Sequence, residues 1–81
     1  MNTTTLNGFS VDHQRLTALT DRQQQVATLV CDGLSNKMIA EKLGVSEGTI
    51  KGHLHAIYGK LGVNSRTKLM ILWENKRDPR A

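Results

Sequence analysis

The sequence predicts an all-α fold, a four-helix bundle built around a central helix-turn-helix. Apolar residues recur at helical spacing in four separate stretches, each preceded by a residue that favours a helix start and most followed by a glycine. No strand pattern or internal repeat appears, and the single proline, Pro79, lies near the C-terminus. A chain of 81 residues is expected to form one domain with a small core.

The first helix is expected to begin after Thr20 and to end at Gly33. Thr20 and Gln23 fit a capping box, in which each side chain bonds the backbone N–H of the other residue. Gly33 stands where a left-handed residue commonly follows a helix. The apolar face between these ends comprises Val26, Ala27, Leu29, Val30 and Cys31. Residues 1–18 are interpreted as a flexible lead-in or linker, with a short helical turn expected over 11–18.

Two helices joined by a tight turn follow. Ser35 and Ser46 are the expected N-caps of these helices, and Gly44 and Gly62 are the expected stops. The longer of the two, over about residues 46–61, carries one continuous apolar stripe of Ile50, Leu54, Ile57 and Leu61.

The spacing within this pair is typical of a helix-turn-helix. Ala40 is small where two helices approach closely, and Gly44 follows where the chain turns. Ile50 then anchors the second helix in the core. In such a motif the second helix lies in the major groove of DNA.

A fourth helix is expected to open at Asn64 or Ser65 and to end near residue 76. Its apolar residues, which fit either the core or a dimer interface, are Leu69, Leu72 and Trp73. The folded domain is therefore expected over residues 19–76, followed by a tail over 77–81.

The positive charge of the chain is concentrated in one region. The net charge is +4, and the stretch from Asn36 to Lys68 holds six basic and two acidic residues, whereas the rest is balanced. A local positive excess favours a polyanionic partner, because counterions are released from phosphates on binding. A generic soluble surface is the alternative, and charge alone does not decide between them.

The outer face of the third expected helix offers groups that suit a DNA groove. Lys51 and His55 lie one turn apart, and both can donate to acceptors on base edges. Gly48 and Gly52 carry no side chain, so the backbone can approach the groove closely, although a helix glycine costs about 1 kcal/mol. For Gly59, close approach and a tolerated weakness are equally open. Phosphate contacts are expected at caps and helix N-termini, at Thr20, Ser35, Asn36, Lys37, Ser46 and Thr49.

Four motifs in order closely resemble the LuxR-type DNA-binding domain of bacterial regulators, which is found in NarL/FixJ response regulators and GerE-like proteins. They are residues 19–23 (LTDRQ), 33–40 (GLSNKMIA), 46–53 (SEGTIKGH) and 60–66 (KLGVNSR). The resemblance covers residues 19 to about 73. It implies base contacts from Lys51, Gly52 and His55. It implies DNA-backbone contacts from Thr20, Asn36, Lys37, Ser46, Thr49 and His53. It also implies a dimer interface on the fourth helix, at Leu69, Leu72 and Trp73.

The sequence departs from the family pattern at three places. Gln23 stands where the family usually has Glu, which puts an internal salt bridge with a neighbouring basic residue in question. Gly52 replaces a larger side chain, which weakens the expectation of direct base readout there. Leu69 and Met70 stand where Ala is frequent, which alters either core packing or the dimer interface.

No metal site, cofactor, membrane span or enzymatic activity is expected. His53 and His55 lie about 200° apart on a helix, so they cannot clamp one ion. Cys31 is the only cysteine, which excludes an intrachain disulfide, suits a core position and favours a reducing cytoplasm. The sequence contains no apolar run approaching about 18 residues.

Two classes of function therefore remain. The first is a cytoplasmic, nucleoid-associated transcription regulator that binds double-stranded DNA sequence-specifically as a homodimer, with RNA polymerase as a further partner. The alternative is a protein-interaction module on the same scaffold, contacting RNA polymerase or another regulator. The basic residues near the helix caps and Lys51 favour DNA.

Overall fold

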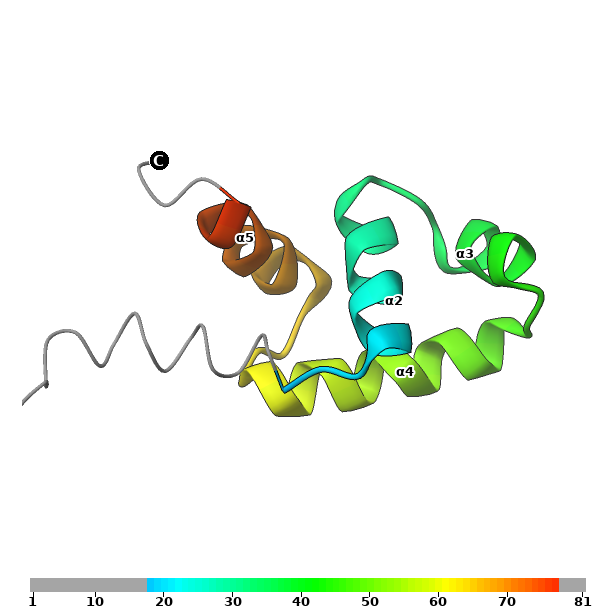
Figure 1. Cartoon of the computed structure of the whole chain (residues 1–81), viewed down its shortest axis with the longest axis horizontal. Helices are drawn as coiled ribbons and strands as arrows, with labels where there is room; N and C mark the ends of the chain where they lie inside the picture. Colours follow the sequence, from blue (N-terminus) through cyan, green and yellow to red (C-terminus); the bar gives the residue numbers. More distant parts are fainter. Residues whose placement is uncertain (1–17, 78–81) are drawn as a thin grey trace, which may run out of the picture.

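Four helices and no strand make up residues 18–77, the part of the chain that the computed structural model describes (Figure 1). The helices are α2 (Asp21–Cys31), α3 (Asn36–Leu43), α4 (Glu47–Leu61) and α5 (Arg66–Arg77). The predicted all-α, four-helix architecture is therefore confirmed. The lead-in over residues 1–17, including most of the helical turn expected there, and residues 78–81 of the tail lie outside the described residues.

Each helix begins at the residue that its local sequence indicates. Thr20 Oγ1 accepts from the Gln23 N–H at 3.1 Å, and Gln23 Oε1 accepts from the Thr20 N–H at 3.0 Å, which completes the capping box. Ser35 and Ser46 each accept the N–H three residues further on, as does Ser65 before α5. These bonds satisfy first-turn N–H groups that have no partner within the helix.

The connection between α3 and α4 is short and closed by backbone geometry. Gly44 has a φ of 72°, a left-handed conformation that strains residues with a Cβ. The N–H of Val45 donates to the carbonyl oxygen of Ala40 at 3.0 Å, so the end of α3 is capped before α4 begins. Gly33 and Gly62 adopt similar left-handed conformations at the ends of α2 and α4, with φ values of 97° and 71°.

Helix α4 is the central element of the fold. It packs against both α2 and α3, and α5 packs against the other side of α2 (Figure 1). The stripe that the sequence predicts on this helix is confirmed, because Ile50, Leu54, Ile57 and Leu61 are all buried. The other buried hydrophobic residues are Leu19, Val26, Ala27, Val30, Ile39, Ala40, Leu69 and Trp73. Within residues 18–77, no helix combines the length and the apolar character needed to cross a membrane.

Candidate nucleic-acid interface

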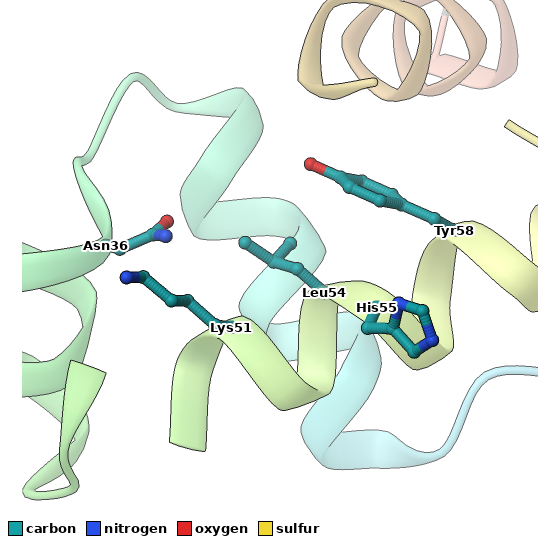
Figure 2. A pocket seen from close by; sticks show the side chains of 5 residues that line it. All are labelled: Asn36, Lys51, Leu54, His55 and Tyr58. Atoms are coloured by element: carbon teal, nitrogen blue, oxygen red, sulfur yellow. The ribbon is translucent and has the colours of Figure 1, made fainter. Parts of the chain in front are cut away.

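An open hollow lies where the outer surface of α4 meets the start of α3. Asn36 from α3 and Lys51, Leu54, His55 and Tyr58 from α4 line it (Figure 2). Lys51 and His55 are exposed, and the side chain of Lys51 extends toward Asn36 (Figure 2). The hollow thus unites two of the residues expected to contact bases with one expected to contact the DNA backbone.

Three glycines of α4, at positions 48, 52 and 59, leave gaps between the side chains on its exposed surface. A Cβ added at Gly52 or Gly59 would meet no heavy atom within 4 Å, and one at Gly48 would meet only Ser46 Oγ at 3.7 Å. Packing inside the domain therefore does not require glycine at any of these positions. Close approach to a partner and tolerated weakness remain the two explanations, as the sequence left them.

Four of the other expected contact residues lie at helix N-termini, outside the lining of the hollow. Thr20 caps α2, Lys37 is in the first turn of α3, and Ser46 and Thr49 open α4. All four are exposed, whereas His53, further along α4, is half-buried. Helix N-termini carry a partial positive charge and free N–H groups, which suit the anionic oxygens of phosphates.

The cap of α4 combines two hydroxyl groups. Ser46 Oγ accepts the backbone N–H of Thr49 at 3.0 Å and also lies 3.0 Å from Thr49 Oγ1. A hydroxyl group has one donor and two acceptor sites, so the pair can satisfy the helix N-terminus and still donate a hydrogen bond outward. Capping, the role expected for Ser46, is confirmed.

Arg66 is a functional candidate that is not among the residues expected above to contact DNA. Its guanidinium donates to Asn36 Oδ1 at 3.1 Å and to the carbonyl oxygen of Leu34. Arg66 thereby joins the start of α5 to the start of α3. Its place in the motif over residues 60–66 was the available signal, but its partners lie 30 and 32 positions earlier in the chain.

The basic neighbour of Gln23 is Lys60. Lys60 Nζ donates to Gln23 Oε1 at 2.9 Å and to the carbonyl oxygen of Ala18 at 3.2 Å. A neutral amide therefore stands where a carboxylate would form an ion pair. The departure from the family pattern at this position leaves a hydrogen bond between α2 and α4 in place of a salt bridge.

The apolar residues of α5 divide between the core and the surface. Leu69 is 0% exposed and Trp73 is 8% exposed, so the structure assigns both to the core, one of the two alternatives for them. Leu72 is half-buried. Met70 and Ile71 are 37% and 57% exposed and carry most of the apolar surface that α5 offers to a partner.

No cluster of three or more His, Cys, Asp or Glu side chains that could hold a metal ion occurs between residues 18 and 77. The short connection between α3 and α4 and the packing of these two helices define a helix-turn-helix domain. A family model described as bacterial regulatory proteins, luxR family, matches residues 17–73. The chain belongs to this family.

Similar proteins carry the same domain within longer chains. The transcriptional regulatory protein YdfI of Bacillus subtilis (strain 168) is 46% identical over 56 residues, which are 69% of this chain and 26% of YdfI. The nitrate/nitrite response regulator protein NarP of Escherichia coli (strain K12) is 38% identical over 69 residues, 85% of this chain and 32% of NarP.

A solved structure of the response regulator StyR has a TM-score of 0.82 and 41% sequence identity, covering 88% of this chain and 36% of that one. The chain thus spans only part of the length of the proteins that it matches.

Proposed function

We propose that this domain binds a specific DNA sequence within a bacterial transcription regulator, with α4 in the major groove. The observation that carries the proposal is the hollow that Lys51 and His55 of α4 line together with Asn36 of α3. Lysine and histidine can donate to acceptors on base edges, while the N-termini of α3 and α4 suit phosphate oxygens. The hollow and the helix N-termini beside it together offer groups for both kinds of DNA contact.

The charge of this surface supports the same partner. Lys37 and Lys51 are exposed on α3 and α4, and the stretch that contains them carries the positive excess of the chain. Such a surface attracts DNA of any sequence, because it binds the phosphates of the DNA. The base contacts then select a site.

We further propose that the domain acts as a homodimer on two half-sites, with the exposed part of α5 as its interface. Met70 and Ile71 supply apolar surface there. Linking two weak sites raises the overall affinity without any new contact to DNA. The place of action would be the nucleoid in the cytoplasm, with RNA polymerase as a further partner of the whole regulator.

The decisive experiment is selection of binding sites from random duplexes, followed by titration of the selected duplex with the unaltered chain and with Lys51→Ala. Lys51→Ala is expected to weaken binding of the selected site by about tenfold or more and to relax its sequence preference. Lys68→Ala removes an equal charge from α5, outside the hollow, and is expected to leave the preference intact. If the unaltered chain binds no duplex at low salt, the proposal fails and the protein-interaction alternative takes its place.

A further inference from the structure

The hydrogen bond between Arg66 and Asn36 fixes the orientation of a side chain at the hollow. Arg66 donates to Asn36 Oδ1 at 3.1 Å. A guanidinium group has only donors, so the atom of Asn36 that faces it must be the amide oxygen. The amide nitrogen then points away from Arg66, and in Figure 2 it lies on the side of Lys51.

We propose that Arg66 is a positioning residue for DNA binding, which holds Asn36 so that its amide N–H groups point into the hollow toward a DNA phosphate. The inference rests on the proposed function, and adds to it a residue that itself makes no contact with DNA. With the oxygen held by Arg66, the amide nitrogen of Asn36 and the ammonium group of Lys51 both present donors at the hollow.

The chemistry of the amide group explains why positioning matters. The two ends of an asparagine amide are nearly equal in shape but opposite in polarity, one a donor and the other an acceptor. An amide that turned its oxygen toward the hollow would repel a phosphate. A bond that only the oxygen can accept removes this second orientation before DNA arrives, which lowers the cost of ordering on binding.

The position of Arg66 in its own helix supports the inference. Arg66 is the first residue of α5, where a positive charge is unfavourable because the helix dipole is positive at that end. The helix itself therefore gives no reason for arginine. The bonds to Asn36 and to the carbonyl oxygen of Leu34 give one, since together they fix the connection that leads into α3.

Asn36→Asp tests whether a donor is needed at this position, because a carboxylate still accepts from Arg66 but is negatively charged and cannot donate to a phosphate. The probe is a fluorescein-labelled duplex of mixed sequence at low salt, with affinity measured by anisotropy. We expect Asn36→Asp to weaken binding by more than about tenfold, and by more than Asn36→Ala, without a lower Tm. Asn75→Asp, an exposed change of the same charge near the end of α5, should have little effect.

Arg66→Lys tests whether Arg66 acts through Asn36. It keeps the charge, so the slope of log K against log salt should stay unchanged while affinity falls about fivefold. In the Asn36→Ala background the same change should have no further effect on affinity. An equal loss in both backgrounds would show that Arg66 contacts DNA or supports the fold generally, and either overturns the inference.

The two proposals fail in different ways. If the unaltered chain binds the duplex and Asn36→Asp binds it equally well, only the positioning role of Arg66 is overturned. If the unaltered chain does not bind at low salt, the proposed function is overturned and this inference with it.

Discussion

Lys60 Nζ donates to Gln23 Oε1 at 2.9 Å, which ties the last turn of α4 to the first turn of α2. The same oxygen accepts the N–H of Thr20 in the capping box at 3.0 Å. One amide oxygen therefore serves both the start of a helix and a contact between two helices. Because the amide is neutral, Lys60 has a hydrogen-bond partner here without a neutralising charge.

Gln23→Glu is expected to stabilise the domain. The carboxylate would pair with Lys60, keep the capping box and suit the positive end of α2, for a gain of about 0.2–1 kcal/mol in the free energy of unfolding. Urea denaturation at low and high salt measures it, and the gain should shrink at high salt. The ionised carboxylate is the form that pairs, so the gain should also be lost as the pH falls and this group is protonated.

Gln24→Glu is the matched control, because it adds the same charge to α2 at an exposed position next along the chain. It should give a smaller gain than Gln23→Glu. Equal gains from the two variants would mean that the helix dipole, and not Lys60, accounts for the effect.

Gly52→Ala and Gly59→Ala separate folding from DNA reading on α4. A Cβ has free space at both positions, so each variant should gain up to about 1 kcal/mol of unfolding free energy from better helix propensity. Only Gly52→Ala should change the selected DNA sites, by adding a methyl group that favours thymine at the facing position. Gly59 lies about 10 Å further along the helix axis. Selection from random duplexes with both variants checks this, and identical sites for Gly52→Ala and the unaltered chain would contradict it.

Ser46→Asp separates capping from phosphate contact at the start of α4. Asp is as good an N-cap as Ser, so the free energy of unfolding should change by less than about 0.5 kcal/mol. Its negative charge should nevertheless weaken DNA binding about tenfold or more, if phosphate lies at this N-terminus. Ser65→Asp makes the same exchange at the cap of α5, outside the expected contacts, and should bind DNA more tightly than Ser46→Asp. Thermal unfolding and anisotropy titration measure the two effects.

Leu69→Ala and Ile71→Glu distinguish the buried side of α5 from its exposed side. Leu69 is fully buried, so Leu69→Ala should cost about 2–5 kcal/mol of unfolding free energy. Ile71 is 57% exposed, so Ile71→Glu should leave the Tm of the protomer nearly unchanged while lowering cooperative binding to paired half-sites. Sedimentation with the selected duplex measures the stoichiometry. Unchanged two-to-one complexes with Ile71→Glu would contradict an interface at this face.

The helix ends and the stripe of α4 could be predicted because neighbouring residues decide them. A Ser or Thr cap acts on an N–H three positions away, and a glycine stop depends on its own φ. The residues inside each of the four motifs are likewise neighbours in the sequence. Caps, stops and spacing therefore located the helix-turn-helix before any packing was known.

The contacts between helices could not be predicted in the same way. Arg66 and Asn36 meet over 30 positions of sequence, and Lys60 and Gln23 over 37, through angles that only the packed core fixes. The buried face of α5 was ambiguous for a different reason. Residues 69–73 are five consecutive apolar residues, which cover the full circumference of a helix, so the pattern indicates no single inner face.

The buried face and the exposed face of α4 have different roles. Folding depends on the buried residues of the helix, from Ile50 to Leu61, whereas the positions that face outward at 48, 51, 52 and 55 contribute nothing to the core. Different side chains at those outward positions would leave the fold of the domain intact. The same scaffold could therefore be retargeted to another operator by exchanging a few residues on one side of a single helix.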